Sequence, residues 1–324
     1  MEQRRVGSSG LAVSRLGLGT MTWGRDTDEH EAREQLTAFV EAGGTLVDTA
    51  AGYAAGDSER VIGSLLGEVV ARESVVLATK GGIHRRGDLR LVDTSRRGLL
   101  ADLDASLGRL GVDHVDLWQV HTWSDETPLE ESLSALEHAV TSGRARYVGI
   151  SNYSGWQTAQ AATLMAARGL PLVSTQVEYS LVQRGVEREV MGACDALGLG
   201  VFPWSPLGRG VLTGKYRNGT PADSRAASPH FASFVQPYLG PDGRRIVQAV
   251  CTAAEGLGVA PLEVALAWVR DRPGVVAPVV GARTAAQLRG ILEAESLALP
   301  DEIREALDEV SAPFTGYPDQ ARWR

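Results

Sequence analysis

The sequence predicts an α/β protein of the (β/α)8 barrel class, the TIM barrel. Eight short β-rich runs alternate with longer segments of helical spacing, and most of the runs are almost continuously apolar. Strands covered by helices on both faces have such apolar sequences. Eight strand–helix units fit within 324 residues, and no linker rich in Ser, Gly or Pro divides the chain. We therefore expect one domain over residues 1–324.

The expected strands are distributed along the whole chain, with helical segments between them. They cover residues 15–20, 45–48, 75–80, 115–121, 147–151, 173–179, 200–204 and 275–281. Two helical segments show apolar stripes at intervals of three and four residues, formed by Leu99, Leu103, Leu107 and Leu110 and by Leu129, Leu133, Leu136 and Val140. Thr127 precedes the second stripe, and we expect it to cap that helix, with Pro128 at the first helical position.

Two additions to the barrel are expected, together with a C-terminal tail over residues 312–324. Residues 1–14 contain apolar positions around Gly7 and Gly10, which predicts a β-hairpin that closes the bottom of the barrel. Residues 205–242 follow the seventh strand and include a long stretch rich in Pro, Gly, Ser and Ala. A loop of that length inside a compact domain is usually functional or disordered. Because it follows a strand, it emerges at the carboxyl-terminal face, where barrel enzymes have their active sites.

An open, doubly wound sheet is the alternative fold. Such a sheet usually carries a Gly-x-Gly-x-x-Gly turn after its first strand, and the sequence has none. The glycines at Gly208, Gly210 and Gly214 miss that spacing. They also miss the phosphate-binding Walker A pattern, because Tyr216 follows Lys215 where Ser or Thr is required.

Composition restricts the partners and the compartment. A formal net charge of −8 argues against nucleic acid or an anionic membrane surface as a partner. No apolar run has the length of a membrane span, and no secretory signal is visible. The two cysteines, Cys194 and Cys251, lie far apart, and the six histidines lack metal-ligand spacing. We expect a soluble cytoplasmic protein without a metal site.

Four polar side chains stand at the ends of three consecutive predicted strands. Asp48 ends the second strand and Tyr53 follows five residues later, Lys80 ends the third strand, and His121 ends the fourth. Each residue alone has an ordinary structural explanation, such as a capping aspartate or a core histidine. Because the carboxyl ends of barrel strands share one face, we expect the four side chains to meet in one pocket.

This set of side chains suits carbonyl reduction. A tyrosine has an ordinary pKa of about 10, and a nearby ammonium stabilises its phenolate. We expect Lys80 to lower the pKa of Tyr53, and Asp48 to hold Lys80 charged and in position. His121 can donate a hydrogen bond to a substrate carbonyl. With a hydride donor beside the carbonyl carbon, Tyr53 can deliver the proton to the oxygen.

The sequence resembles the aldo-keto reductase superfamily, most closely its bacterial and potassium-channel-β-subunit-like branch. The catalytic segments of that family are similar to Asp48-Thr49-Ala50-Ala51-Gly52-Tyr53, Ala78-Thr79-Lys80 and Trp118-Gln119-Val120-His121. Further similarities run from Gly17-Leu18-Gly19-Thr20-Met21 through Gly149-Ile150-Ser151-Asn152 and Pro203-Trp204-Ser205-Pro206-Leu207 to Gly281-Ala282-Arg283-Thr284. The resemblance covers nearly the whole chain and implies that Asp48, Tyr53, Lys80 and His121 are the catalytic tetrad.

The resemblance also implies a nicotinamide cofactor, bound without a Rossmann domain. Ser151, Asn152 and Gln176 would hold the nicotinamide amide, with Asp48, Thr20 and Met21 beside that end of the cofactor. The ribose and pyrophosphate would lie along Trp204, Ser205, Pro206, Leu207, Gly208, Gly210 and Lys215. Gly281, Arg283 and Gln287 would complete the cofactor-binding set, and residues 205–242 would fold over the dinucleotide.

Arg283 favours NADPH (NADP+) over NADH. It stands at the beginning of a helix expected near Thr284, where a cation opposes the helix dipole at a cost of roughly 0.3–1 kcal/mol. A bound 2′-phosphate would reverse that balance. A solvated surface arginine is the alternative interpretation. Relatives often carry Glu and Asn at the positions of Gly290 and Ile291, so this chain lacks those side-chain contacts to the adenine.

A small-molecule carbonyl compound is the expected partner. Trp23, Trp118 and Trp123 could form an aromatic substrate pocket with Tyr53 and His121, although aromatic packing around the rim explains them as well. Three other functions remain open: a slow, redox-sensing regulatory subunit, a metal-independent barrel lyase or isomerase, and a sugar-nucleotide reductase of secondary metabolism. The physiological substrate and the oligomeric state stay open.

Overall fold

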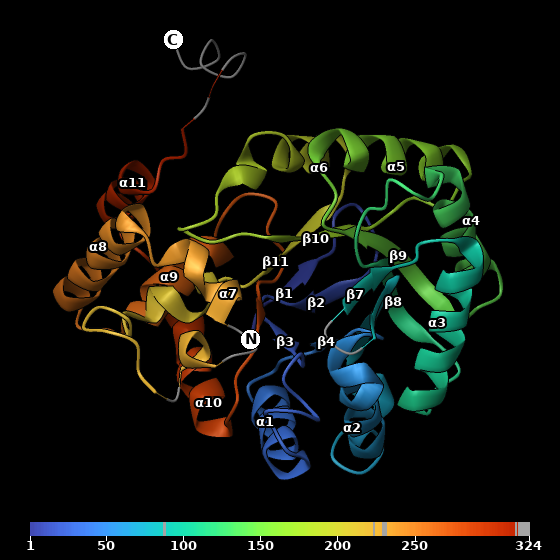
Figure 1. Ribbon diagram of the computed structural model, residues 1–324, viewed down its shortest axis with the longest axis horizontal. Coiled ribbons are helices and arrows are strands. Elements are labelled where there is room, and N and C mark those ends of the chain that lie inside the picture. Colours follow the sequence, from blue (N-terminus) through green and yellow to red (C-terminus); the bar gives the residue numbers. More distant parts are fainter. Residues whose placement is uncertain (87–88, 223, 229–231, 315, 317–324) are drawn as a thin grey trace.

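The computed structural model describes residues 1–86, 89–222, 224–228, 232–314 and 316. Within these residues, eight parallel strands close into a barrel, which confirms the predicted (β/α)8 fold (Figure 1). Around the barrel the strands are β3 (Gly17–Gly19), β4 (Leu46–Asp48), β5 (Val76–Gly81), β8 (Val115–Val120), β9 (Ala145–Ser151), β10 (Ser174–Glu178), β11 (Gly200–Trp204) and β12 (Val279–Val280). The last strand is short because Pro278, which has no N–H to donate, precedes it.

Helices surround the barrel and bury its outer face. In chain order they are α1 (Glu29–Glu41), α2 (Asp57–Leu65), α3 (Arg96–Leu110), α4 (Leu129–Thr141), α5 (Gly155–Ala167), α6 (Val190–Leu197), α8 (Pro241–Leu257), α9 (Pro261–Arg270), α10 (Ala285–Glu293) and α11 (Asp301–Val310). The leucine stripe of α3 faces the strands, with Leu99, Leu103 and Leu110 buried. Helix α4 begins one residue later than expected, so Pro128 takes the N-cap position that was predicted for Thr127.

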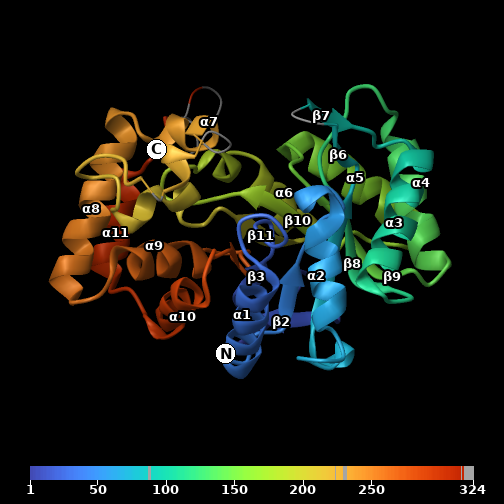
Figure 2. The same cartoon turned by 60° about the horizontal axis from the view of Figure 1, so that its bottom comes forward.

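The bottom of the barrel is closed by the predicted N-terminal hairpin. Strands β1 (Gln3–Arg5) and β2 (Ala12–Ser14) pair antiparallel, with Gln3 opposite Ser14. Val6 and Val13 pack on Leu117 and Phe202 in a small core inside the barrel. Gly7 has a φ of +56°, and a Cβ there would lie 2.2 Å from a backbone oxygen, so only glycine fits this contact. Figure 2 shows the N-terminus at the bottom of the barrel.

Two elements stand over the mouth of the barrel, on opposite sides of it (Figure 2). One is an antiparallel hairpin of β6 (Ile83–Arg86) and β7 (Leu89–Val92), which the sequence did not predict. The other is the expected segment 205–242, which is partly helical. It contains the 3₁₀ turns η4 (Gly208–Thr213), η5 (Arg225–Ala227) and η6 (Gln236–Tyr238) and the short helix α7 (Ala232–Val235). Residues 223 and 229–231 of this segment, and most of the predicted tail 312–324, lie outside the described residues.

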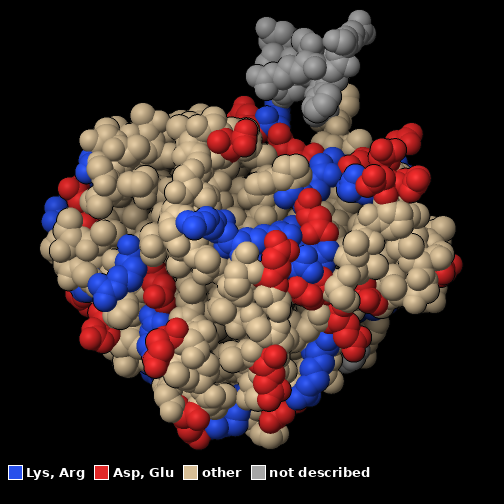
Figure 3. Space-filling model, turned by 180° about the vertical axis from the view of Figure 1, so that it is seen from behind, with Lys and Arg blue, Asp and Glu red and all other residues tan. Residues whose placement is uncertain are grey.

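The face behind the barrel mixes basic and acidic side chains (Figure 3). Around the N-terminal hairpin, Arg4 pairs with Asp271, and Arg15 pairs with both Glu2 and Glu295. Among the described residues, no single helix has the length and apolar composition of a membrane span. Helices α8 and α9 reach that composition only together, as a pair bent by 103°.

Candidate active site

The fold brings Asp48, Tyr53, Lys80 and His121 together at the mouth of the barrel. Asp48 ends β4, Lys80 is the second-last residue of β5, and His121 follows β8 directly. Parallel pairing sets these strand ends side by side, with Asp48 opposite Ala78 and Lys80 opposite Gln119. Tyr53 opens a one-turn 3₁₀ helix, η1 (Tyr53–Gly56), which follows β4.

A buried ion pair forms the base of the site. The Nζ atom of Lys80 donates to Oδ2 of Asp48 at 2.6 Å and to the backbone oxygen of Thr49 at 2.7 Å. The two side chains are 0% and 3% exposed. The same Nζ lies 5.2 Å from the centre of the Tyr53 ring, and the Tyr53 and His121 rings meet edge to face at 5.8 Å. One cation therefore lies against the phenol, and the imidazole lies beside it.

The pKa of Tyr53 differs in direction from the expectation. Burial is the largest influence and raises this pKa; the positive charge of Lys80 lowers it, and the negative charge of Asp48 raises it again. The net pKa lies above the ordinary 10.0. The expected lowering by Lys80 is present, but it is outweighed, because a phenolate loses more by leaving water than it gains from one partly neutralised ammonium.

The pKa values of Lys80 and His121 define their charges. Burial is the largest single influence and lowers the pKa of Lys80, but the charges and hydrogen bonds of Asp48 and Tyr53 together outweigh it, and the net pKa is raised. The pKa of His121 is held well below 6.5 by burial and then by the positive charges of Lys80 and Arg90. Lys80 is therefore an ammonium and His121 a neutral imidazole near neutral pH. The Nδ1 atom of His121 is buried without a hydrogen-bond partner among the described residues.

A hydrogen-bond network links the predicted nicotinamide-binding residues to this site. Nε2 of Gln176 donates to Oδ1 of Asp48 at 2.9 Å, so Asp48 is held from two sides. The side-chain amide of Asn152 donates to the backbone oxygen of His121 and to Ser151, and it accepts a hydrogen bond from the indole of Trp204. Asn152 has a left-handed φ of 59°. Side-chain amides thus join the end of β4 to that of β10, and the end of β9 to those of β8 and β11.

The residues that would hold a dinucleotide fit that group. Trp204 offers a flat ring, with Phe234 nearly parallel to it at 6.3 Å. Gly208 and Gly210 have φ values of +56° and +92°, and a Cβ on Gly210 would lie 3.3 Å from Nζ of Lys215. The backbone is therefore bare next to a cation, which suits a close approach by pyrophosphate.

The helix expected near Thr284 is α10, and the residues predicted to bind the 2′-phosphate stand at its beginning. Thr284 caps that helix through the N–H of Gln287, and Oε1 of Gln287 accepts from the N–H of Arg283. Gly281 follows β12 directly. Arg283 therefore stands immediately before a capped helix N-terminus, where a guanidinium and the helix dipole can act on one anion.

Several predicted residues have other surroundings than expected. Thr20 is buried, and its hydroxyl bonds to the backbone oxygen of Asp48 and to Ser58, so it supports the strand end. Met21, Ser205, Pro206 and Leu207 lie in the loops after β3 and β11 as expected. Trp23 and Trp118 are both 0% exposed in the core between barrel and helices.

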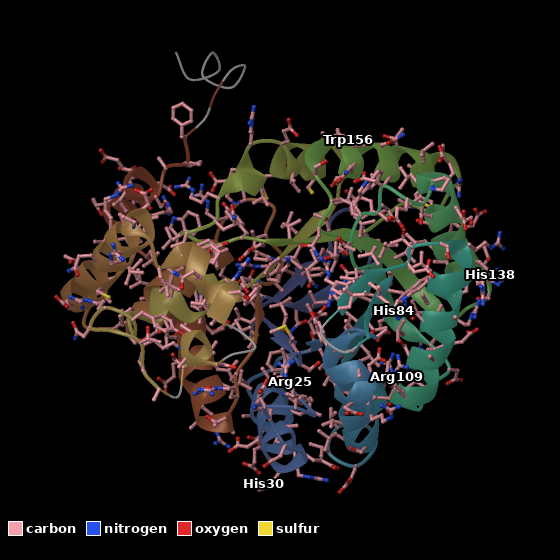
Figure 4. The ribbon with its side chains drawn as sticks, viewed as in Figure 1. Arg25, His30, His84, Arg109, His138 and Trp156 are labelled. Carbon is pink, nitrogen blue, oxygen red and sulfur yellow. The ribbon has the colours of Figure 1, made fainter. Side chains whose placement is uncertain are left out.

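The structure therefore does not bring Trp23 and Trp118 to the substrate side. Trp118 alternates with Leu117 along β8 and points away from the barrel interior, and Trp23 donates to Gln35. Trp123 remains at the rim, with its ring edge to face with those of Tyr153 and Trp156. Trp156 stands on α5 and is largely exposed (Figure 4).

Sequence reasoning missed several residues around the site. Hairpin β6–β7 brings Arg90 close enough to influence His121. A cavity of about 470 Å³ adjoins Asn152 and Trp204, with Tyr153 and Glu178 in its walls. Only the aromatic residue Tyr153, directly after Asn152, offered a sequence signal. The other contacts depend on loops whose positions do not follow from a local pattern.

Comparison with known proteins agrees with this geometry. The sequence model described as "Aldo/keto reductase family" matches residues 15–312. The chain is 36% identical to "Uncharacterized oxidoreductase YrpG" of Bacillus subtilis, with 100% of each chain covered. It is 34% identical to "Probable voltage-gated potassium channel subunit beta" of Oryza sativa, with 98% of each covered. It is 32% identical to "Protein tas" of Escherichia coli, with 98% of this chain and 99% of the relative covered.

Proposed function

The chain belongs to the aldo/keto reductase family of oxidoreductases, and from that premise we propose that it reduces an aldehyde or ketone to an alcohol with NADPH. The observation that carries the proposal is the buried Asp48–Lys80 pair against the phenol of Tyr53, with a neutral His121 beside it. The substrate is a small carbonyl compound, and the loops at the mouth of the barrel determine which one is accepted.

Each side chain of the site has one task. The nicotinamide, when bound, supplies a hydride to the carbonyl carbon. Tyr53 donates its hydroxyl proton to the carbonyl oxygen, and an alcohol results. Lys80 stabilises the phenolate that Tyr53 becomes, and Asp48 keeps Lys80 charged. His121 is neutral, so it can donate one ring N–H to the carbonyl oxygen without adding a full positive charge.

The raised pKa of Tyr53 supports a donor rather than a base. At neutral pH the phenol keeps its proton until negative charge develops on the substrate oxygen. The Lys80 ammonium is already in place and needs no reorganisation when the phenolate forms. Proton transfer in this site is therefore assisted at the moment of reaction, not by an ionised tyrosine in the resting protein.

Substitution of Tyr53 by phenylalanine tests the proposal. The Tyr53→Phe variant keeps the ring but loses the proton, so turnover should fall by a factor on the order of 10²–10⁴. Oxidation of NADPH with a panel of aldehydes measures the turnover. NADPH fluorescence quenching is the control, and it should stay close to that of the unchanged protein. Near-normal turnover in the variant would contradict the role of Tyr53.

The choice of NADPH rests on Arg283. We expect Arg283→Ala to weaken NADPH binding much more than NADH binding, because only NADPH carries the 2′-phosphate. Two titrations by fluorescence quenching compare the cofactors. Equal losses for both would remove the reason for preferring NADPH. Gly290 and the buried Ile291 supply no polar side chain for the adenine, so Arg283 carries a larger share of affinity at this end.

The same measurements separate the alternatives. One relative is named as a potassium channel β subunit, and a regulatory subunit of that kind in this chain would bind NADPH but turn over less than once an hour on every aldehyde. A barrel lyase or isomerase would not quench NADPH fluorescence at all. A sugar-nucleotide reductase would turn over nucleotide-linked keto sugars and reject simple aldehydes.

A further inference from the structure

A second buried ion pair lies on the outer side of β5, behind the catalytic centre. Nε of Arg109 on α3 donates to Oε2 of Glu59 on α2 at 2.7 Å, and Nη2 of the same guanidinium lies 2.6 Å from that oxygen. The other carboxylate oxygen of Glu59 accepts from the hydroxyl of Thr79 at 2.6 Å. Glu59 is 0% exposed, and each of its two carboxylate oxygens has a partner, Thr79 or Arg109. Figure 4 shows Arg109 between α2 and α3.

One end of this pair holds the strand that carries Lys80. Thr79 precedes Lys80 on β5, and side chains alternate along a strand, so Thr79 points outward to Glu59 while Lys80 points into the barrel mouth. The bond from Thr79 to Glu59 therefore fixes the height of this strand end at the residue next to the ammonium.

The other end of the pair supports the turn that carries Tyr53. Gly56 is the last residue of η1, and a Cβ there would lie 2.7 Å from Cδ and 2.8 Å from Nε of Arg109. The arginine is thus packed directly against the backbone of that turn. Glu59 also follows the turn within three residues, on the first turn of α2.

The Tyr53 turn is strained and needs such support. Ala54 and Ala55 have φ values of 47° and 55°, a left-handed conformation that costs free energy for residues with a Cβ. Ser58 bonds to the backbone oxygen of Thr20, which fixes the start of α2. Arg109 packs against Gly56, which follows the two alanines and precedes α2. The strained turn is therefore supported from both sides.

We propose that Glu59 and Arg109 are positioning residues of the catalytic centre, which together set the separation of Tyr53 and Lys80 without contacting substrate or cofactor. The expected effect on turnover rests on the proposed function, whereas the expected effect on the ionisation of Tyr53 does not. The nearest charged group on the same side of β5 is Asp102, which accepts a hydrogen bond from the N–H of Gly82 and lies near His84 of β6. Lys80 and Asp48 are the charged groups on the other side of β5.

Direct titration of Tyr53 tests the proposal. The difference in ultraviolet tyrosinate absorption between each protein and its Tyr53→Phe counterpart reports the ionisation of this one residue. The variants are Glu59→Gln, which keeps the shape and removes the charge, and Arg109→Lys, which keeps the charge and removes the two-pronged contact. We expect Tyr53 to ionise at a pH higher by about half a unit or more, because Lys80 acts on it from farther away.

Arg270→Lys is the matched control. Arg270 is also buried, it pairs with Asp271, and it binds three backbone oxygens at the opposite end of the barrel. All three variants should lower the melting temperature. Only Glu59→Gln and Arg109→Lys should raise the pH at which Tyr53 ionises and lower kcat tenfold or more, with the Kd for NADPH changed by less than about twofold.

The outcomes separate this proposal from the proposed function. An unchanged Tyr53 titration and unchanged kcat in a folded Arg109→Lys protein would overturn the positioning role and leave only a structural ion pair. A shifted titration in a protein that reduces no carbonyl compound would support positioning and remove the reductase. If Glu59→Gln does not fold, Thr79→Val breaks the same link from the side of β5 and is judged by the same readouts.

Discussion

Asp48 is the residue on which the site depends at the smallest scale, because it binds Lys80 through one oxygen and Gln176 through the other. A carboxylate buried this deeply is stable only while both contacts last. It therefore couples two functions in one group: the charge state of the ammonium and the place proposed for the nicotinamide amide. A substitution of Gln176 should consequently alter the position of Asp48 and, through it, the ion pair with Lys80.

The buried pair makes a prediction about stability. Lys80→Met leaves Asp48 as an unpaired buried charge, so the free energy of unfolding should fall by roughly 3–5 kcal/mol. The double variant Asp48→Asn with Lys80→Met removes both charges and should recover most of that loss, while reductase activity stays absent. Denaturant unfolding of both variants measures this. A double variant as unstable as the single one would show that the ion pair is not the source of the loss.

The pKa of His121 depends on the same surroundings. Its imidazole is buried next to one ammonium and within the influence of Arg90, and both effects disfavour a second proton. The sign follows directly: His121 is protonated only well below pH 6.5, so its contribution to activity is constant through neutral pH. Sequence reasoning identified the residue but not this charge state, because the charge depends on burial.

At the scale of elements, Arg209 ties the segment 205–242 to the barrel. Its guanidinium donates to both oxygens of Glu178 at the end of β10 and to the backbone oxygen of Phe234 in α7. It also lies 3.8 Å from the centre of the Phe234 ring and 4.9 Å from that of Tyr238. Tyr238 donates to Glu178 as well. Burial, and after it the negative charge of Glu178, raises the pKa of Tyr238 to about 12.

This contact predicts an effect on cofactor exchange. Arg209→Ala should loosen α7 from Glu178 and raise the rate of NADPH dissociation, because the segment proposed to cover the dinucleotide loses the ion pair that links it to β10. Stopped-flow fluorescence measures the rate. Arg168→Ala, which removes an ion pair with Glu137 on α4, is the control and should leave the rate unchanged. Equal rates in the Arg209 variant and the control would show that this attachment does not limit exchange.

At the scale of the whole molecule, the ion pairs around the N-terminal hairpin contribute stability that depends on pH. Burial by itself raises the pKa of Asp271 and of Glu295. For Asp271, the hydrogen bonds and positive charges of Arg270 and Arg4 outweigh burial. For Glu295, mainly those of Arg15 do so. Both pKa values therefore lie below the ordinary 3.8 and 4.5. A carboxyl with a lowered pKa stabilises the fold above its unfolded pKa and ceases to do so as it is protonated.

The melting temperature should therefore be nearly constant above about pH 5 and should fall as the pH is lowered through about 4. Scanning fluorimetry across this range measures it. Glu295→Gln should start from a lower melting temperature at neutral pH and lose less on acidification, because one of the titrating groups is gone. An equally steep fall in that variant would assign the acid sensitivity to other carboxyls.

The large features of the fold were predictable from local patterns. Eight apolar runs separated by helical spacing allow few arrangements other than a closed barrel, and the N-terminal hairpin follows from Val6, Val13 and the glycines between them. The hairpin β6–β7 was not predictable. Its residues carry no apolar alternation strong enough to indicate strands. Their pairing depends on the positions of the end of β5 and the beginning of α3, which the hairpin connects.

The sequence by itself determined the order of the strands and the polar residues at their carboxyl ends. A strand that is buried on both faces has an apolar sequence, so a polar residue at its end is recognisable from the sequence. Only the tertiary structure decided the direction of the Tyr53 pKa, the inward or outward face of Trp118 and the pairing of Glu59 with Arg109. Those properties depend on how much water remains around a group and on which distant segment packs against it, and neither is a property of neighbouring residues along the chain.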